Sequence, residues 1–460
     1  MLSKMKINNI CCIGAGYVGG PTMTVLADKC PNLKVNVVDT NKKRIALWNN
    51  KDLSNLPIYE PGLSEIIGRA RGKNLFFTSD VEESLKIADM VFISVNTPIK
   101  KKGIGAGQAC DLRWVEASAR QIAKFCTGKT IVVEKSTLPV KTSEVIEEIL
   151  VSTSKSEKGK EFYVLSNPEF LAEGSAVENL LNPDRVLIGG DNQNAIQILK
   201  EIYLNWVKDE KIISTNLWSS ELSKLISNAF LAQRISSINT VSAICEETGA
   251  NIREVSTAVG YDSRIGKNFL QSGPGFGGSC FKKDISNLVY LCNHFELKEV
   301  ANFWEQVLLI NSWQKNRIYR NIVSKLYGNV ANKRIAILGA SFKANTNDLR
   351  ESPSIEICKK LIEEEAYLII HDPQVSQESL ELELESPKGW EFQKNINKVF
   401  IDVDAIIILT EWEIYKSLDW LKIYPIVRRP SWVFDTRHFI DADNVKKSGF
   451  KFWQVGSCND

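Results

Sequence analysis

The chain has 460 residues, enough for two to four domains at roughly 100–200 residues each. Its 57 Lys and Arg residues nearly balance 55 Asp and Glu, giving a net charge of +2. This balance does not call for nucleic acid or an anionic membrane as a partner, and we predict neither. A site for a small phosphorylated molecule stays open, because it needs only a few local charges.

No apolar run approaches the roughly 20 residues of a membrane-spanning helix. Ten cysteines show no CxxC pair, and the three histidines are far apart in sequence. We therefore predict no metal site and a cytoplasmic protein whose cysteines are mostly buried thiols.

The first part of the chain alternates strand and helix patterns. Its strand-like apolar runs are residues 10–13, 35–38, 91–95, 131–133, 162–165 and 185–188. This alternation predicts a mostly parallel sheet with helices on both faces.

The middle of the chain is helical in pattern. Residues 219–247 contain no Pro or Gly, and Gly249 supplies a stop. A helix of about 29 residues would be roughly 43 Å long, which suits a connector between domains or a dimer spine.

A second α/β region follows, with apolar runs at residues 335–338, 367–370, 405–409 and 432–434. The predicted fold class is therefore α/β, with two Rossmann-like open sheets joined by a helical central region with a long helix. We expect an NAD-binding domain in residues 1–213, a central helical domain in 214–328 that carries the dimer contact and a cysteine loop, and a second Rossmann-like domain in 329–460.

A glycine-rich turn follows the first strand directly, with the sequence Gly14-Ala15-Gly16-Tyr17-Val18-Gly19. In a GxGxxG turn the first Gly permits a tight turn, the second admits a pyrophosphate, and the third lets helix and strand pack closely. The alternative is a glycine turn that serves packing alone.

The acidic residue that ends the second strand is Asp39. It would bind the adenosine ribose and repel a 2′-phosphate, which favours NAD over NADP, although Arg44 nearby could tolerate that phosphate. The strand-end residues Asn96, Thr97, Ser136 and Thr137 should lie near the nicotinamide. The second region's turn, Gly339-Ala340-Ser341, lacks the GxGxxG pattern, so we expect no second dinucleotide there.

One cysteine has unusual surroundings. Four glycines fall within the seven residues 273–279 that precede Cys280, and a helical pattern follows at 281–295. A helix start, with Lys282 and Lys283 close in sequence, stabilises a thiolate. The alternative is a structural cysteine in a turn.

Further candidate residues come in pairs. Glu169 and Glu173 could act as bases or bind sugar, or could equally serve as helix-start dipole partners. Lys224 and Asn228 share one helix face, where a lysine is usually solvent-exposed. Asp284 would share a helix face with Cys280. Lys343 and Arg350 could hold a diphosphate or be surface charges.

Several long motifs in order give the chain a family resemblance over nearly its whole length. The matching segments are residues 11–21, 92–98, 134–137, 166–174, 218–228, 275–280 and 350–352. The chain resembles the UDP-glucose/GDP-mannose dehydrogenase family, within it the UDP-glucose 6-dehydrogenases of animal type.

The resemblance implies NAD-dependent, four-electron oxidation of UDP-glucose to UDP-glucuronate without a metal. A first hydride leaves C6 to give an aldehyde, a thiolate adds to it, a second hydride leaves the thiohemiacetal, and water hydrolyses the thioester. The alternative substrates within the family are UDP-N-acetylmannosamine and GDP-mannose. A non-catalytic binding protein is disfavoured, because Cys280, Lys224 and Asp284 are all present.

The same resemblance assigns site residues. Cys280 would be the nucleophile, Lys224 would stabilise the oxyanion, and Asp284 and Thr137, assisted by Glu173, would position water. The implied cofactor contacts are Gly14, Ala15, Gly16, Tyr17, Val18, Gly19, Asp39, Arg44, Val95, Asn96, Thr97, Ser136, Thr137, Glu173 and Arg350. The implied substrate contacts are Glu169, Phe170, Leu171, Lys224, Asn228, Arg264, Phe276, Gly277, Phe342, Lys343 and Arg437.

The resemblance also implies assembly and has departures. Arg264 is similar to an arginine that reaches the neighbouring subunit's substrate, so we expect a homo-oligomer built from dimers, with hexamers in the animal-type relatives. Inhibition by UDP-xylose is a further hypothesis. Residues 436–438 read Thr-Arg-His where the family usually has Gly-Arg-Arg or Gly-Arg-Asn, which puts the contact made by His438 in doubt. Residues 380–397 match poorly and are expected to form a surface loop.

Overall fold

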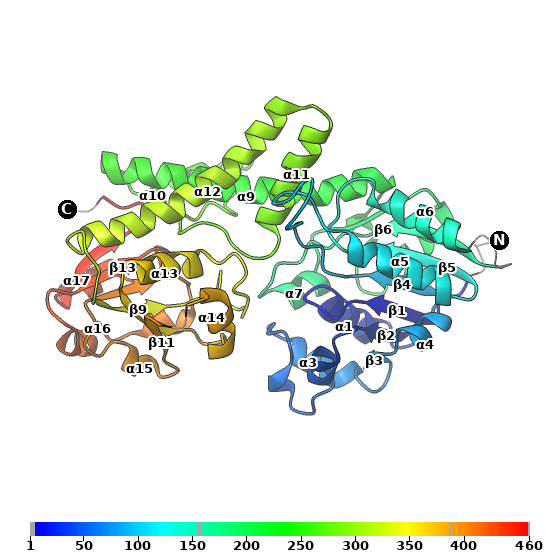
Figure 1. Cartoon of the computed structure of the whole chain (residues 1–460), viewed down its shortest axis with the longest axis horizontal. Coiled ribbons are helices and arrows are strands. Elements are labelled where there is room, and N and C mark those ends of the chain that lie inside the picture. The colour runs from blue at the N-terminus through cyan, green and yellow to red at the C-terminus, as the bar shows by residue number, and fades with distance from the viewer. Residues whose placement is uncertain (1–4, 155–158, 387, 459–460) are drawn as a thin grey trace. The chain divides into compact units, whose positions relative to one another are not determined.

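The computed structural model describes residues 5–154, 159–386 and 388–458. It divides into two compact units (Figure 1). The N-terminal unit comprises residues 1–227 and 286–295, and the C-terminal unit comprises residues 228–285 and 296–460.

The N-terminal unit is built on an eight-stranded sheet in the order β3-β2-β1-β4-β5-β6-β7-β8. Every neighbouring pair is parallel except β6 and β7. The strands are β1 (Asn9–Ile13), β2 (Lys34–Val38), β3 (Leu75–Thr78), β4 (Met90–Ile93), β5 (Lys129–Glu134), β6 (Glu161–Ser166), β7 (Val186–Gly190) and β8 (Ile212–Thr215).

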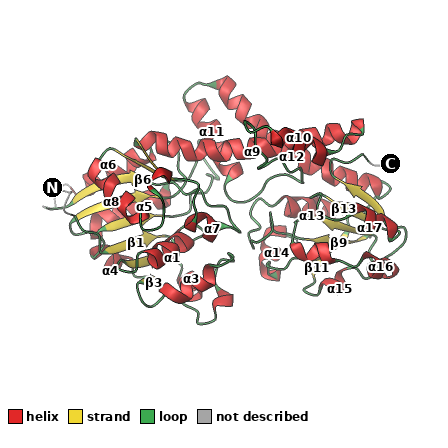
Figure 2. Ribbon diagram, turned by 180° about the vertical axis from the view of Figure 1, so that it is seen from behind, coloured by secondary structure: helices red, strands yellow, loops and turns green. Residues whose placement is uncertain are grey.

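Apolar residues fill both faces of this sheet. Along β1, Ile10 and Cys12 belong to one buried cluster, whereas Cys11 and Ile13 belong to another. Helices flank the strands (Figure 2). They are α1 (Gly19–Lys29), α2 (Lys42–Trp48), α3 (Leu63–Ala70), α4 (Val81–Lys86), α5 (Arg113–Phe125), α6 (Thr142–Ser154), α7 (Ala176–Leu181) and α8 (Gln193–Tyr203), with short 3-10 turns at Leu53–Asn55 and Asp209–Lys211.

The C-terminal unit contains a six-stranded, fully parallel sheet in the order β11-β10-β9-β12-β13-β14. Its strands are β9 (Arg334–Leu338), β10 (Tyr367–His371), β11 (Trp390–Phe392), β12 (Ala405–Ile408), β13 (Trp432–Asp435) and β14 (Lys451–Gln454). Its later helices are α13 (Pro353–Glu363), α14 (Gln377–Leu384), α15 (Ile396–Val399), α16 (Trp420–Ile423) and α17 (Ala442–Lys447), with 3-10 turns at Glu413–Ser417 and Tyr424–Ile426.

The two sheets share one topology. Numbered within each sheet, the first six strands of both follow the order 3-2-1-4-5-6, the doubly wound arrangement of Rossmann folds. In such sheets the strand order reverses between the first and fourth strands, and ligands bind at the carboxyl ends there. The predicted fold class is confirmed.

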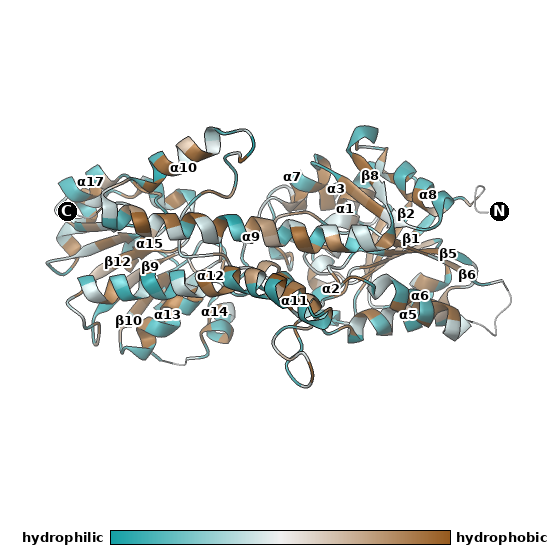
Figure 3. Ribbon diagram, turned by 90° about the horizontal axis from the view of Figure 1, so that it is seen from above, coloured by the Kyte–Doolittle hydropathy of each residue, from teal (hydrophilic) through white to brown (hydrophobic). Residues whose placement is uncertain are grey.

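Four helices make up the middle of the chain: α9 (Leu217–Thr248), α10 (Ile252–Tyr261), α11 (Phe281–His294) and α12 (Lys298–Lys325). The predicted long helix is present in α9, which has 32 residues and alternates polar and apolar stretches along its length (Figure 3). Among the described residues, no helix combines the length and apolarity that crossing a membrane requires.

One prediction about secondary structure is wrong. The described residues of the segment 380–397 do not form a surface loop, because α14, β11 and α15 occupy most of them. Residue 387 lies outside the described residues. Leu380 and Leu384 are buried in the core of the C-terminal unit. The poor match of this segment to the family therefore reflects a divergent sequence and not an absence of regular secondary structure.

Candidate active site

The turn after β1 has the geometry of a dinucleotide cradle. Gly14 has φ +111°, and a Cβ there would lie 2.2 Å from the Ser94 carbonyl oxygen. A Cβ on Gly19 would lie 2.0 Å from the Gly14 carbonyl oxygen. At Gly16, by contrast, no atom lies within 4 Å of the Cβ position. Two glycines thus serve packing and one faces open space, which fits the close approach of a pyrophosphate.

The Asp39 carboxylate lies beside this turn. Its Oδ2 accepts the Ala15 amide at 3.0 Å and pairs with Arg44 at 3.0 Å, while Oδ1 accepts the Asn41 amide at 2.8 Å. The carboxylate is thus fixed at the end of β2, where a ribose hydroxyl is bound in dinucleotide sites. Tyr17 is half-buried on the same turn.

The ends of β4 and β5 are joined by side chains. The Thr97 hydroxyl donates to the Thr137 carbonyl at 3.1 Å, and the Ser136 hydroxyl donates to the Val95 carbonyl at 3.0 Å. Asn96, which lies between Val95 and Thr97 in the chain, is exposed. The structure thus brings together the strand-end residues that we expected near the nicotinamide.

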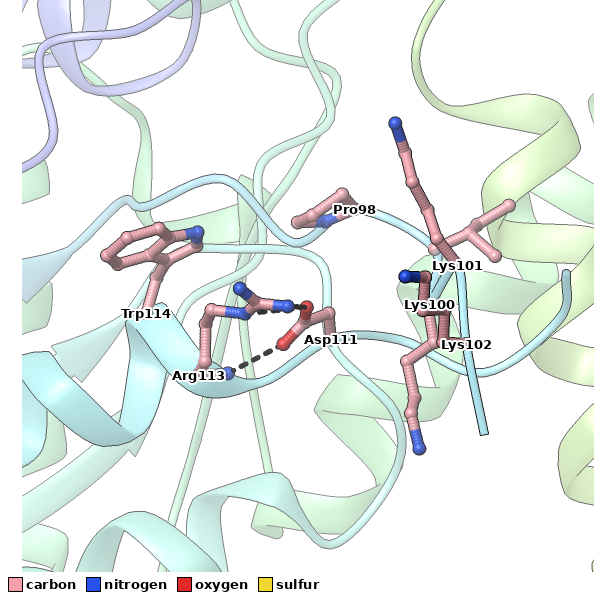
Figure 4. A pocket seen from close by; sticks show the side chains of 8 residues that line it. Pro98, Lys100, Lys101, Lys102, Asp111, Arg113 and Trp114 are labelled. Carbon is pink, nitrogen blue, oxygen red and sulfur yellow. Dashed lines mark hydrogen bonds and ion pairs between the residues drawn. The ribbon is translucent and has the colours of Figure 1, made fainter. Parts of the chain in front are cut away.

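A separate basic cavity of about 500 Å³ follows this strand end (Figure 4). Arg113 pairs with Asp111 at 2.6 Å within it. None of the predicted site residues lines it, so it is distinct from the dinucleotide cradle. The lining residues are Pro98, Ile99, Lys100, Lys101, Lys102, Asp111, Arg113 and Trp114.

A buried ion pair holds the loop after β6. The Lys135 ammonium, 3% exposed, lies 2.9 Å from Oε2 of Glu169 and donates to Asn167 and Tyr203 at 3.0 and 3.2 Å. Burial lowers the pKa of Lys135, but the charges and hydrogen bonds of Glu169 and Tyr203 together outweigh burial and leave that pKa raised. Oε1 of Glu169 accepts the amides of Phe170 and Leu171. Glu169 is therefore engaged through both oxygens.

The Phe170 ring carries two cations. Arg185 lies 3.9 Å and Lys224 5.2 Å from its centroid. Lys224 is only 6% exposed, so it does not have the solvent exposure usual for a helix lysine. Glu173 is half-buried in the following turn.

Cys280 differs from most other cysteines in exposure. Eight cysteines are buried, Cys458 is exposed, and Cys280 is intermediate. Burial raises the pKa of Cys12, Cys126 and Cys358 to about 12, which makes them inert thiols at neutral pH. Most cysteines are thus buried thiols, as we predicted, and Cys280 is one of the two that are not buried.

Two further predicted site residues are in contact. The Asn228 amide donates to Oδ2 of Asp284 at 2.6 Å, and Lys283 lies 3.5 Å from Oδ1. The backbone amide of Asp284 donates to the Cys280 carbonyl at 2.8 Å, which begins α11. Asp284 is 1% exposed, so its carboxylate depends on these partners.

The cysteine loop lies against the turn after β9. Gly278 donates its amide to the Arg350 carbonyl at 2.9 Å, and a Cβ on Gly277 would lie 3.0 Å from the Phe342 Cβ. Arg437 donates to the Phe342 carbonyl at 2.9 Å. Lys343, the neighbour of Phe342, is half-buried. These predicted contacts form one cluster in the C-terminal unit.

Two salt bridges orient the arginines of this cluster. The Arg350 guanidinium donates to Asp348 at 2.8 Å. That of Arg437 pairs with Glu411 at 3.1 Å and donates to the Leu409 carbonyl at 2.7 Å. Sequence reasoning missed Glu411, since a lone glutamate after a strand carries no signal of its partner.

Arg264 and His438 stand apart. Arg264 is 87% exposed and pairs with Asp262 at 2.6 Å, so the structure does not bring it to the cluster. His438 adopts φ +54°, places Nδ1 3.2 Å from the Val455 carbonyl, and accepts Arg253 on its own carbonyl at 2.7 Å. Burial and Arg253 lower the pKa of His438. Its contacts are thus to the protein backbone and to Arg253.

Within the described residues, no group of three or more His, Cys, Asp or Glu side chains is arranged to hold a metal ion. The sites found therefore consist of a glycine turn, ion pairs and one half-buried thiol.

Three family models match the chain in order. They are the NAD binding domain (residues 8–207), the central domain (218–313) and the UDP binding domain (336–442) of the UDP-glucose/GDP-mannose dehydrogenase family.

Whole-length relatives agree with these models. UDP-glucose 6-dehydrogenase 1 of Glycine max is 51% identical over 97% of this chain and 96% of its own length, and UDP-glucose 6-dehydrogenase 3 of Arabidopsis thaliana is 52% identical over the same shares. The structure of a UDP-glucose dehydrogenase from Pyrobaculum islandicum has a TM-score of 0.85 at 30% identity, covering 99% of both chains. That of a UDP-D-ManNAc dehydrogenase from Pyrococcus horikoshii has a TM-score of 0.81 at 25% identity, covering 97% and 99%.

Because the models match in order and the relatives match over almost their full length, this chain belongs to the UDP-glucose/GDP-mannose dehydrogenase family.

Proposed function

We propose that this chain is an NAD-dependent oxidoreductase that converts UDP-glucose to UDP-glucuronate. Identity of 51–52% to plant UDP-glucose 6-dehydrogenases carries the choice of substrate, because it extends over 96% of those proteins. The UDP-D-ManNAc dehydrogenase structure shares only 25% identity.

The residues of the glycine turn fit NAD. Open space over Gly16 admits the pyrophosphate, and the fixed Asp39 carboxylate suits the ribose hydroxyls. The Asp39 carboxylate disfavours a 2′-phosphate, although Arg44 forms a salt bridge with Asp39. Bound NAD supplies a hydride acceptor. Around it we assign contacts to Tyr17, Val18, Asn96 and the other strand-end residues, to Glu173, and to Arg350.

The thiol explains how one site performs two oxidations. Once C6 is an aldehyde, the Cys280 thiolate adds to it and the thiohemiacetal gives up a second hydride. Water then attacks the thioester carbonyl, and the C–S bond breaks to release a carboxylate and restore the thiol. Lys224 stabilises the oxyanion, while Asp284, Thr137 and Glu173 position water.

The substrate contacts divide by chemistry. Lys343 and Arg437 neutralise the diphosphate, with Phe342, Phe276 and Gly277 beside it. Glu169, Phe170, Leu171, Lys224 and Asn228 surround the sugar. Arg264, which is exposed and anchored by Asp262, is assigned to the substrate of a neighbouring subunit.

We assign three domains, 1–213 for NAD, 214–328 for the central helices and 329–460 for the UDP-sugar. The family models at residues 8–207, 218–313 and 336–442 support these boundaries. We further propose a homo-oligomer of dimers, with the hexamer of animal-type enzymes as its full form. A cytoplasmic location is supported by ten free thiols.

Stoichiometry tests the reaction. UDP-glucose and excess NAD should yield two NADH per UDP-glucose consumed, and UDP-N-acetylmannosamine and GDP-mannose should give turnover at least tenfold lower. A ratio of one would refute the four-electron reaction, and preferred turnover of either rival would refute the substrate.

The Cys280→Ser variant tests the covalent step. It should release UDP-glucuronate far more slowly than the native chain, because the serine hydroxyl does not form an alkoxide nucleophile at neutral pH. Release at the native rate would exclude the thioester route while leaving the overall reaction intact.

A further inference from the structure

The loop that carries Cys280 is irregular and yet mostly buried. Residues 272–276 and Gly278 are buried, and none of residues 271–280 belongs to a helix or strand. Buried backbone amides and carbonyls must find hydrogen-bond partners, and secondary structure supplies none here. For Gly273 and Phe276, side chains from the neighbouring helices take that role.

Three buried amide side chains hold the loop. Asn239 of α9 accepts the Gly273 amide at 2.9 Å, and Gln314 of α12 donates to the Gly273 carbonyl at 2.8 Å. Asn311, one turn before Gln314, is 5% exposed and contacts the loop at its centre.

Asn311 bonds to both backbone groups of one loop residue. Its Oδ1 accepts the Phe276 amide at 2.8 Å, and its Nδ2 donates to the Phe276 carbonyl at 3.0 Å. An asparagine amide thus replaces the partner strand that this backbone lacks. Asp can keep only the first bond when ionised, and Leu, of similar size, can keep neither.

The glycine beside Phe276 matches this asparagine. Gly275 has φ +117°, and a Cβ there would lie 2.6 Å from the Asn311 Oδ1. The loop therefore approaches α12 at a distance that excludes a side chain. The close contact with Asn311 is therefore one reason for a glycine at position 275, near Cys280.

Phe276 is connected to Cys280 through Phe281. The Phe276 ring packs edge-on against Phe281, with centroids 5.7 Å apart. Phe281 begins α11 and directly follows Cys280, whose carbonyl accepts the first helical hydrogen bond. A shift of Phe276 would thus move the residue that sets the position of Cys280 at the helix start.

We propose that Asn311 is a positioning residue that holds the cysteine loop in its reactive conformation. Its importance for turnover rests on the proposed function, whereas its effect on the thiol does not. Misplacement of a reacting group by about 1 Å can cost on the order of a hundredfold in rate. A displaced Cys280 would also lose its place at the positive end of α11.

The test compares Asn311→Leu with Asn302→Leu, an exposed asparagine on the same helix. Three quantities are measured on the full chain: the alkylation rate of Cys280 by iodoacetamide at pH 7, read by peptide mass spectrometry; kcat with UDP-glucose; and KM for NAD. Asn311→Leu should slow alkylation of Cys280 at least threefold and lower kcat at least tenfold. Alkylation of exposed Cys458 and KM for NAD should stay within twofold, and Asn302→Leu should change nothing.

Asn311→Asp keeps the bond to the Phe276 amide and should give intermediate values, and it decides the question if Asn311→Leu does not fold. Native alkylation of Cys280 and native kcat in a folded Asn311 variant, even with a lowered melting temperature, would overturn the proposal. If the unaltered chain does not oxidise UDP-glucose, the proposed function fails, while the alkylation rates still decide the role of Asn311.

Discussion

At the scale of single residues, the buried ammonium of Lys135 has three partners to lose. It pairs with Glu169 and donates to Asn167 and Tyr203 where β5 and β6 end. Lys135 lies within one of the family motifs, but the sequence indicates no role for it, because its partners are distant in sequence. Removing one member of a buried pair leaves the other charge uncompensated.

We therefore expect Lys135→Met to lower the free energy of unfolding by about 3–5 kcal/mol. Lys129→Met is the control, since Lys129 pairs with Glu161 at the exposed start of the same strand, and it should leave the urea midpoint unchanged. Adding Glu169→Gln to Lys135→Met should restore part of the loss. An unchanged midpoint in Lys135→Met would mean that the pair is not buried in solution.

Cys358 on α13 gives a pH-dependent prediction. Burial raises its pKa from 9.0 to about 12, so the native chain keeps a proton that the unfolded chain releases above pH 9. The stabilising contribution is complete below pH 9 and is lost as the pH rises towards 12, at about 1.4 kcal/mol per pH unit.

Cys358→Ala should therefore flatten the fall in the free energy of unfolding between pH 9 and 11 by about that slope. The exposed Cys458 provides the control, because Cys458→Ala should leave the slope as it is. Parallel profiles for Cys358→Ala and the unaltered chain, measured by urea unfolding, would contradict the assignment of a raised pKa.

At the scale of elements, the turn between β1 and α1 separates packing from binding. Gly14→Ala would place a methyl group against the Ser94 carbonyl in a left-handed backbone, and we expect it to unfold the N-terminal unit or melt it at least 5 °C lower. Gly16→Ala meets no protein atom, so its melting temperature should be unchanged.

NAD affinity should be the property that Gly16→Ala changes, although its melting temperature does not change. Gly16→Ala should weaken NAD binding at least tenfold, measured by titration calorimetry, because its methyl group occupies the space assigned to the pyrophosphate. Full NAD affinity in Gly16→Ala would place the pyrophosphate elsewhere.

The elements found from sequence are the central ones. β1, β4, β9 and β12 are continuous apolar runs, because parallel strands at the centre of a sheet are buried on both faces. The strands that sequence analysis missed, β3, β8, β11 and β14, lie at sheet edges and carry exposed or half-exposed positions. The helical amides that hold the cysteine loop were missed because Asn and Gln on a helix look like surface residues in the sequence.

At the scale of the whole molecule, the two sheets repeat one topology, yet one unit alone is predicted to bind a dinucleotide. Asp372 ends β10 as Asp39 ends β2, but its Oδ2 accepts the amides of Ala340 and Ser341 and the Trp412 indole N–H. Asp372 is 4% exposed, so its carboxylate is used by the protein itself. This supports the prediction that the second sheet takes no second dinucleotide.

Two helices of the C-terminal unit carry exposed apolar side chains. Phe230 of α9 and Phe303 of α12 are 54% and 53% exposed, and both rings contact Trp304. Leu309 and Trp313, further along α12, are also exposed. Contiguous exposed apolar residues mark interaction surfaces, and we assign this one to a second copy of the chain.

Phe303→Glu places a charge in that surface, which a dimer contact would have to bury at a cost of several kcal/mol. At micromolar concentration, we expect the fraction of chain that sediments as an oligomer to fall by at least half, measured by sedimentation velocity. The melting temperature of the dissociated chain should be unchanged. The control is Leu421→Glu, since Leu421 is 68% exposed on α16, and it should assemble as the unaltered chain does. If Phe303→Glu retained the full assembled mass down to nanomolar concentration, the surface of Phe230 and Phe303 would not be the contact, and the exposed residues of α10 would be the next to change.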